Sequence, residues 1–117
     1  MDTGLKGKTV LITGASRNMG RLAAIEFARE GANLALCTSS KMKELNEVAV
    51  EARGLGAKVV AERCDVASEG DVNKFVEKTR KELGTVHVAI NNAVNRGAEG
   101  SFLDEATRRG SPISRST

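Results

Sequence analysis

The sequence predicts an α/β protein with a Rossmann-like open parallel sheet and helices on both faces. Two observations lead to this fold class. Short apolar, β-branched segments alternate with amphipathic segments, and glycines stand at the boundaries between them. Strands that alternate with helices of about 10 to 15 residues are typical of parallel sheets with right-handed crossovers. The pattern amounts to about four strands and three to four helices.

Residues 8–13 are the first predicted strand, because a continuous apolar and β-branched segment is typical of a strand buried on both faces. From Gly20, apolar residues recur at steps of three and four until Gly31, which predicts a helix that ends at this glycine. Residues 33–37 are the second predicted strand. The chain therefore opens in the order of a βαβ unit.

The same alternation continues along the chain. Residues 41–53 have one apolar face and precede a glycine, so they are the second predicted helix. Residues 58–64 are the third strand. Residues 68–83 are the third helix, which begins with a capping-box-like Ser-Glu-Gly-Asp sequence and ends before another glycine. Residues 86–90 are the fourth strand.

The composition changes after the fourth strand. We expect residues 1–93 to form one Rossmann-like half domain and residues 94–117 to form an irregular tail. The tail is rich in glycine, serine and arginine, and its apolar spacing predicts one helix at residues 102–109. Residues 110–117 have no periodic pattern, and a chain end of this kind is expected to fray.

Composition excludes several functional classes. The 117 residues include 18 basic and 15 acidic residues, well mixed, and no Trp or Tyr, which argues against nucleic-acid binding. No apolar segment approaches the ~20 residues that cross a bilayer, and no signal-peptide core follows Met1. We therefore expect a cytoplasmic protein without a membrane partner.

Cys37 and Cys64 lack zinc-ligand spacing, so we expect no metal site and two reduced packing residues.

The loop between the first strand and the first helix is the best candidate for a binding site. In an open α/β sheet, ligands bind at the carboxyl ends of the strands, and glycines there let the backbone approach a phosphate closely. The free N–H groups at the helix start favour its negative charge. The spacing of the glycines in this loop differs from the general Gly-x-Gly-x-x-Gly pattern. The candidate residues are Gly14, Ala15, Ser16, Arg17, Asn18, Met19 and Gly20.

With the elements around it, this loop resembles that of the short-chain dehydrogenase/reductase family, which has the sequence Thr-Gly-x-x-x-Gly-x-Gly. Gly14 and Gly20 match this pattern, and Asn18 stands in place of the middle glycine. Asparagine tolerates a left-handed backbone better than other side chains do, so it is compatible with the turn. The resemblance extends over about residues 5–109.

Two further motifs of the family occur in the expected order. Asp65 and Val66 follow the third strand and resemble the pair that brackets the adenine ring of the cofactor. The sequence Asn-Asn-Ala-Val, which begins at Asn91, resembles Asn-Asn-Ala-Gly with valine in place of the glycine. The resemblance implies that Asn92 and Ala93 line the cofactor's ribose.

The residues after the second strand favour NADP over NAD. An enzyme that prefers NAD usually places a carboxylate there to bind the ribose 2′-hydroxyl, whereas residues 37–40 are Cys-Thr-Ser-Ser. Arg17 and Ser39, with Lys41, are candidates to bind a 2′-phosphate. The Gly-Ala-Ser-Arg loop and the hydroxyl-rich strand end resemble reductases of the 3-oxoacyl-carrier-protein type. We therefore expect an NADP-binding half domain.

The resemblance implies an oxidoreductase that transfers hydride between the nicotinamide and a small-molecule carbonyl or alcohol. In the family a tyrosine acts as general acid/base beside a lysine and a serine. Those residues belong to the second half of a longer chain, which also carries the homo-oligomer interface, and this sequence has no tyrosine. We therefore assign no catalytic residue and expect a truncated or frame-shifted product that is inactive by itself.

Other interpretations stay open. The chain is alternatively a non-catalytic NADP-binding module, or an inactive remnant whose fourth strand leaves an apolar edge. A methyltransferase is a weaker alternative, because that fold usually has an acidic residue at the end of its second strand and this chain has none there. Gly20 can serve helix packing alone, and Arg17 can be a solvated charge. Asp65 can cap a turn, and Asn91 can brace the sheet.

Overall fold

Strands and helices alternate along most of the chain. The computed structural model describes residues 4–16, 18–92 and 114–116. The four strands and three helices that the sequence predicts before residue 93 are all present, with bounds close to the predicted ones. The elements in chain order are β1 (Thr9–Thr13), α1 (Asn18–Arg29), β2 (Asn33–Thr38), α2 (Met42–Gly54), β3 (Val59–Arg63), α3 (Glu69–Leu83), β4 (Val88–Asn91) and β5 (Ser114–Ser116).

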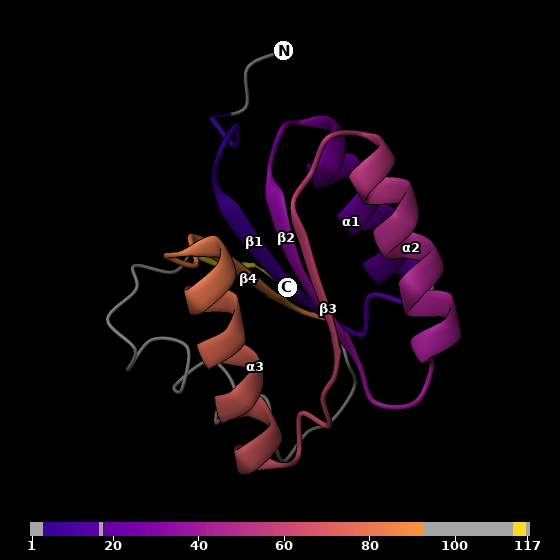
Figure 1. Cartoon of the computed structure of the whole chain (residues 1–117), viewed down its shortest axis with the longest axis vertical. Coiled ribbons are helices and arrows are strands. Elements are labelled where there is room, and N and C mark those ends of the chain that lie inside the picture. Colours follow the sequence, from indigo (N-terminus) through magenta and orange to yellow (C-terminus); the bar gives the residue numbers. More distant parts are fainter. Residues whose placement is uncertain (1–3, 17, 93–113, 117) are drawn as a thin grey trace.

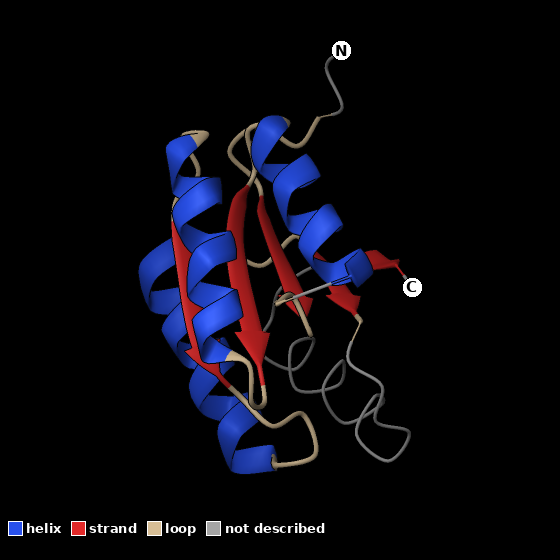
Figure 2. Cartoon of the chain, turned by 90° about the vertical axis from the view of Figure 1, so that its right-hand side faces the viewer, coloured by secondary structure: helices blue, strands red, loops and turns tan. Residues whose placement is uncertain are grey.

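The strands form one sheet in the order β3-β2-β1-β4-β5, and every neighbouring pair is parallel. β1 is central, with Leu11 opposite Ala35 of β2 and Ala89 of β4. Helices α1 and α2 cover one face of the sheet and α3 covers the other (Figure 1). The strands therefore lie between two helical layers (Figure 2). The predicted Rossmann-like fold is confirmed, and the strand order reverses at β1, where ligands of such sheets bind.

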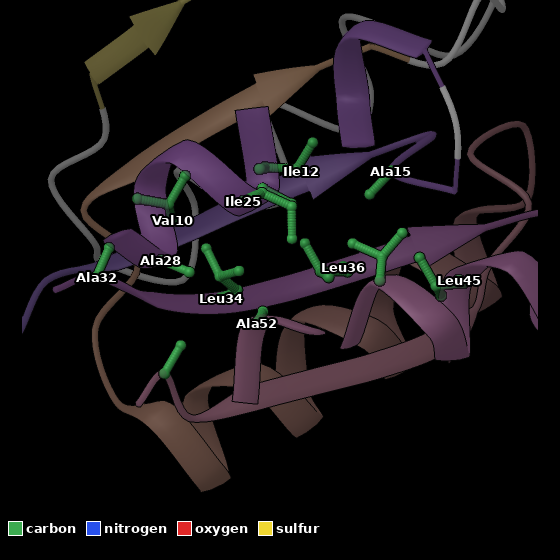
Figure 3. Close-up of a cluster of buried hydrophobic side chains, with 13 residues drawn as sticks. Val10, Ile12, Ala15, Ile25, Ala28, Ala32, Leu34, Leu36, Leu45 and Ala52 are labelled. Atoms are coloured by element: carbon green, nitrogen blue, oxygen red, sulfur yellow. The ribbon is translucent and has the colours of Figure 1, made fainter. Parts of the chain in front are cut away.

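The core has two parts because alternate strand residues point to opposite faces of the sheet. Val10 of β1 and Leu34 of β2 pack against Ile25 of α1 in the aliphatic cluster drawn in Figure 3. Leu11 points the other way, into a second cluster that contains Phe75 of α3. Every residue of β1 is buried, which explains why its sequence is continuously apolar and β-branched.

The helices are short and amphipathic. α1, α2 and α3 have 12, 13 and 15 residues, and each buries one side against the sheet. Helix α3 begins after Ser68, whose side-chain oxygen accepts a hydrogen bond from the Asp71 N–H, as the capping sequence predicts. Within the described ranges, no helix has the length and apolar character needed to cross a membrane.

The end of the chain differs from its sequence-based prediction. Residues 114–116 were expected to fray with the rest of 110–117, but they form β5, which pairs in parallel with β4 so that Val88 lies opposite Ser114. The pairing uses backbone groups of the β4 edge and therefore has no signature in the side-chain pattern. The helix predicted at residues 102–109 lies outside the described residues.

Candidate nucleotide-binding site

The loop between β1 and α1 turns sharply at the carboxyl end of the sheet. Gly14 has a φ of 61°, in the left-handed region that favours glycine. Asn18, the first residue of α1, lies in the same region with a φ of 58°. Asparagine adopts this conformation more readily than other side chains, so the turn is retained without a glycine at this position. Asn18 and Met19 are exposed at the start of the helix, where the first N–H groups have no partner within the helix.

Gly20 packs tightly against the glycine loop and against the residue that follows β4. A Cβ atom at this position would lie 2.3 Å from the carbonyl oxygen of Gly14 and 2.7 Å from Nδ2 of Asn92. It would also lie 3.0 Å from the Cα of Ala15. Any side chain here would therefore push the loop, the helix and the end of β4 apart, and only glycine fits.

A polar network joins the carboxyl ends of β1 and β4. The Thr13 hydroxyl donates to Oδ1 of Asn91 over 2.7 Å and accepts from the Asn92 N–H over 2.9 Å. The Asn92 amide then donates through Nδ2 to the carbonyl oxygen of Gly14 over 3.1 Å. Asn92 therefore holds the first residue of the glycine loop, and Thr13 holds Asn92.

One polar side-chain atom of Asn91 takes no part in this network. Its Nδ2 is buried, and among the described residues it has no hydrogen-bond partner. Buried amide donors without a partner are uncommon because desolvation without a hydrogen bond costs free energy. The atom belongs to the last residue of β4, directly opposite Thr13 of β1. A ligand acceptor at this end of the sheet would meet an available donor.

The loop is also tied to the end of β2. The Ala15 N–H donates to the carbonyl oxygen of Cys37 over 3.2 Å, and the hydroxyl oxygens of Ser16 and Thr38 lie 3.5 Å apart. Ser16 and Thr38 are both buried. Ser39 and the two residues that follow it are exposed, and none of them carries a carboxylate. The site therefore has buried hydroxyls at its base and exposed hydroxyls and a lysine at its rim.

Asp65 lies just after β3 and shapes a turn. Its Oδ1 accepts a hydrogen bond from the Ala67 N–H over 2.9 Å, and its carbonyl oxygen accepts from the Ser68 N–H over 2.8 Å. Its own N–H donates to Oδ2 of Asp71 over 3.1 Å. Val66 is buried in the cluster beneath α3. The turn-capping role considered for Asp65 is therefore present, and Oδ2 is the carboxylate oxygen that these bonds do not use.

Two buried thiols meet beneath the ends of β2 and β3. Cys37 and Cys64 are free cysteines of the cluster beneath α3, as the sequence predicts for packing residues. A hydrogen bond between the two thiols, reinforced by burial, raises the pKa of Cys37 well above its ordinary value. The same hydrogen bond lowers the pKa of Cys64. No group of three or more potential metal ligands occurs among the described residues.

The structure brings several of the predicted site residues together. Gly14, Ser16, Asn18, Gly20 and Asn92 belong to one connected region at the carboxyl end of the sheet. Two further candidates, Arg17 and Ala93, lie outside the described residues. The site list drawn from the sequence omitted Thr13 and Thr38. Both are hydroxyls at the carboxyl end of a buried strand, a signal that points to a functional position rather than to packing alone.

Comparisons with known proteins agree with this geometry. The family model described as short chain dehydrogenase matches residues 8–109. General stress protein 39 of Bacillus subtilis (strain 168) is 35% identical over 100 residues, which are 86% of this chain and 35% of that protein. 17-beta-hydroxysteroid dehydrogenase 13 of Rattus norvegicus is 40% identical over 87 residues, 74% of this chain and 29% of that protein. The chain therefore spans about a third of the length of these relatives.

Solved structures show the same architecture. A short-chain type dehydrogenase/reductase from Mycobacterium marinum is 36% identical with a TM-score of 0.69, covering 74% of this chain and 34% of that one. The NAD+-bound xylitol dehydrogenase is similar in fold, with a TM-score of 0.84 at 24% identity, and covers 95% of this chain and 53% of that one. The glycine loop, the Asn91–Asn92 network and the match over residues 8–109 lead to one conclusion. This chain belongs to the short-chain dehydrogenase family.

Proposed function

We propose that this chain forms the nucleotide-binding part of an oxidoreductase that transfers hydride between a nicotinamide cofactor and a carbonyl or alcohol. The observation that carries the proposal is the cradle at Gly20, where any Cβ would meet Gly14 and Asn92. Backbone packed this closely at the start of a helix, at the reversal of strand order, accommodates a pyrophosphate. Asn91 Nδ2, a buried donor that has no partner among the residues the structure describes, adds a second feature that fits a bound nucleotide.

The preferred cofactor in this proposal is NADP rather than NAD. The 2′-phosphate would lie near the exposed Ser39 and Lys41, where no carboxylate repels it. Arg17 would supply a guanidinium group to bind this 2′-phosphate. Ala15, Ser16, Asn18 and Met19 surround the pyrophosphate, while Asp65, Val66, Asn92 and Ala93 contact the adenosine and ribose parts.

The bound cofactor would supply the hydride. Residues of this chain would hold the cofactor and exclude water from the loop. The substrate is a small-molecule carbonyl or alcohol. Within the family, the Gly-Ala-Ser-Arg loop and the hydroxyls after β2 favour reductases of the 3-oxoacyl-carrier-protein type. The relative from Rattus norvegicus carries the name of a hydroxysteroid dehydrogenase, which supports an alcohol or carbonyl as the reacting group.

A second candidate is a module that binds NADP without chemistry. One observation favours it: the sequence has no tyrosine, so the family's general acid/base cannot come from these residues. The two candidates share the cofactor site and differ in turnover. In both of them, this chain alone binds the cofactor and leaves carbonyl substrates unreduced.

Calorimetric titration of the folded 117-residue chain with NADPH and NADH tests the proposal. We expect saturable binding, tighter for NADPH, and a loss of about 1 to 3 kcal/mol of NADPH affinity in Arg17→Ala, with a smaller loss for NADH. Arg29→Ala is the control, because Arg29 is exposed and, among the described residues, forms its ion pair with Glu26 of its own helix. A folded chain that binds neither dinucleotide contradicts the cofactor site.

Equal losses for both cofactors in Arg17→Ala would contradict the preference for NADP while leaving the nucleotide site in place. Oxidation of NADPH in the presence of a 3-oxoacyl thioester is measured as well, and neither candidate function expects it from this chain alone. Turnover by the chain alone would exclude the non-catalytic module and require an acid/base residue other than tyrosine.

A further inference from the structure

We propose that the outer edge of β3 is a docking site for β3 of a second copy of this chain, and that the Arg53 side chain closes this site. The pairing is antiparallel and centred on Val60. β3 is the last strand on one side of the sheet, and Figure 1 shows it between α2 and α3. The inference concerns assembly of the chain and goes beyond the proposed function.

Alternate residues of β3 direct their backbone groups away from the sheet. At the start of the strand, the Lys58 carbonyl accepts the Leu34 N–H of β2 over 2.8 Å, so the backbone of Lys58 faces inward. Because the backbone groups of successive strand residues point to opposite sides, Val59 and Ala61 direct their N–H and C=O groups outward. Groups of this kind on a sheet edge can pair with another strand.

One of these outward groups is covered by a side chain of α2. Arg53, in the last turn of α2, donates through Nη2 to the Val59 carbonyl oxygen over 2.9 Å. Arg53 is exposed, so this bond lies at the surface of the molecule. A strand that pairs with β3 needs the same carbonyl oxygen as an acceptor, and the guanidinium has to leave before the strand can bind. Natural proteins use charged side chains at sheet edges to limit such pairing.

The sequence of β3 is complementary to itself in one antiparallel register. With Val60 opposite Val60 of the second copy, Val59 lies opposite Ala61 of the second copy, and these residues exchange both of their N–H···O=C bonds. The same register places Lys58 opposite Glu62 of the second copy. The two-fold symmetry of the pair repeats each of these contacts. Opposite charges directly across two strands stabilise their pairing.

The Glu62 carboxylate can accept a second ammonium group. Lys78 of α3 donates to Oε2 of Glu62 over 2.7 Å, and this bond does not use Oε1. Lys58 is exposed and Glu62 is partly exposed. Because alternate strand residues share a face, Lys58 lies on the α3 side of β3 with Glu62 and with Val60, which belongs to the cluster beneath α3. Lys58 of the second copy can therefore reach Glu62 without displacing Lys78.

The next register along the strand lacks this complementarity. In it, Ala61 lies opposite Ala61 of the second copy, and Lys58 lies opposite Cys64, which is buried. Glu62 then lies opposite Val60. Neither charge meets an opposite charge, so the register centred on Val60 is favoured.

The first experiment measures self-association of the full chain by analytical ultracentrifugation. Arg53→Ala should associate at least about tenfold more tightly than the wild type, because the charge-assisted bond to Val59 no longer has to be broken in either copy. Arg29→Ala is the matched control, since Arg29 is also an exposed arginine in the last turn of a helix and binds Glu26 of that helix. Its association should equal that of the wild type.

Arg53→Met covers the case in which Arg53→Ala does not fold. Methionine keeps a long unbranched side chain at the end of α2 but has no N–H donor for the Val59 carbonyl, so the same gain in association is expected. A folded Arg53→Ala or Arg53→Met chain that associates no more tightly than the wild type overturns the inference. The proposed nucleotide site would be unaffected by that result, because these experiments contain no nucleotide.

Charge variants in the Arg53→Ala background test the register. Lys58→Glu places two carboxylates opposite each other on both sides of Val60 and should weaken association about tenfold. Adding Glu62→Lys restores opposite charges across the strands and should restore association. Hydrogen exchange at the Ala61 amide should slow whenever the copies associate, because the second strand covers this amide. Association that does not respond to these charges, or that leaves the exchange of Ala61 unchanged, overturns the inference.

Discussion

At the amino-terminal ends of the strands, side chains hydrogen-bond directly to the backbone of neighbouring segments. The Thr9 N–H donates to Nδ1 of His87 over 3.1 Å, and the Thr9 hydroxyl donates to the carbonyl oxygen of Leu83 over 3.3 Å. At the carboxyl ends the Thr13 network has similar bonds, but it also leaves Nδ2 of Asn91 without a partner among the described residues. A left-handed Asn18 and the tight contact at Gly20 occur at this end as well.

The polar groups at the two ends of the sheet therefore differ in what they contribute: those at the amino end stabilise the fold, and those at the carboxyl end also serve binding. Polar groups at the amino end find their partners inside the fold, so their removal affects the free energy of unfolding alone. The carboxyl end contains a left-handed turn, a closely packed backbone and a buried donor with no partner in the described part of the chain, features that persist where they serve a ligand. Variants at the two ends should therefore differ in whether nucleotide affinity changes along with stability.

The largest effect is expected for Gly20→Ala. Its new methyl group would lie 2.3 Å from the Gly14 carbonyl oxygen and 2.7 Å from Asn92 Nδ2, so backbone has to move. We expect a loss of about 3 kcal/mol in the free energy of unfolding and no measurable NADPH binding. Gly54→Ala is the control, because nothing lies within 4 Å of a Cβ there. Normal NADPH affinity in Gly20→Ala would show that the loop does not need this contact.

The next effect is expected for Thr13→Val, also at the carboxyl end. The substitution keeps the side-chain shape but removes the donor to Asn91 and the acceptor of the Asn92 N–H. Urea unfolding should show a loss of about 2 kcal/mol, because buried partners are left unsatisfied. Nucleotide affinity should fall too, since Asn92 holds Gly14. Loss of stability with unchanged affinity would mean that the network only braces the sheet.

A smaller effect is expected for His87→Leu, at the amino end. Leucine removes the acceptor of the Thr9 N–H, and the reverse bond from the His87 N–H to the Thr9 carbonyl remains. The free energy of unfolding should fall by about 1 kcal/mol. NADPH affinity, measured by calorimetry on the folded variant, should equal that of the wild type. A parallel loss of affinity would remove the distinction between the two ends.

The smallest effect concerns the thiol pair beneath the site. Cys37→Ala removes the hydrogen bond that lowers the pKa of Cys64, while burial and the carboxylates of Asp71 and Asp65 continue to raise it. The pKa of Cys64 should therefore move from below to above its ordinary value, as followed by the ultraviolet absorbance of the thiolate. A pKa of Cys64 that stays low in this variant would show that the neighbouring Cys37 thiol is not what lowers it.

The pH dependence of stability follows from the same shift. In the wild type, the lowered pKa of Cys64 contributes stability that is present above its unfolded-state pKa and is lost as the pH falls through its folded-state pKa. In Cys37→Ala, with the pKa of Cys64 raised, the contribution changes sign: stability falls as the pH rises from the unfolded-state to the folded-state pKa. Urea unfolding across the alkaline range measures this slope.

The sequence alone determined the order and type of the elements from Thr9 to Asn91. Periodicity and glycine position carry this information because they reflect local backbone geometry and the face that each element buries. The glycine loop, including the tolerance of Asn18 for a left-handed backbone, was predictable for the same reason. So was the position of the site at the end of β1, since strand order in βαβ units follows general rules.

Tertiary structure decided everything that depends on register between distant segments. Asn92 meets Gly14 and Gly20 only because β4 pairs with β1 so that Asn91 lies opposite Thr13. Thr38 contacts three segments from the end of β2: its hydroxyl oxygen lies near that of Ser16 and accepts the Lys41 N–H, and its carbonyl oxygen accepts the Cys64 N–H. The pairing of residues 114–116 with β4 uses backbone bonds that leave no side-chain pattern. Side-chain periodicity records which face is buried, but it does not record which partner lies across from it.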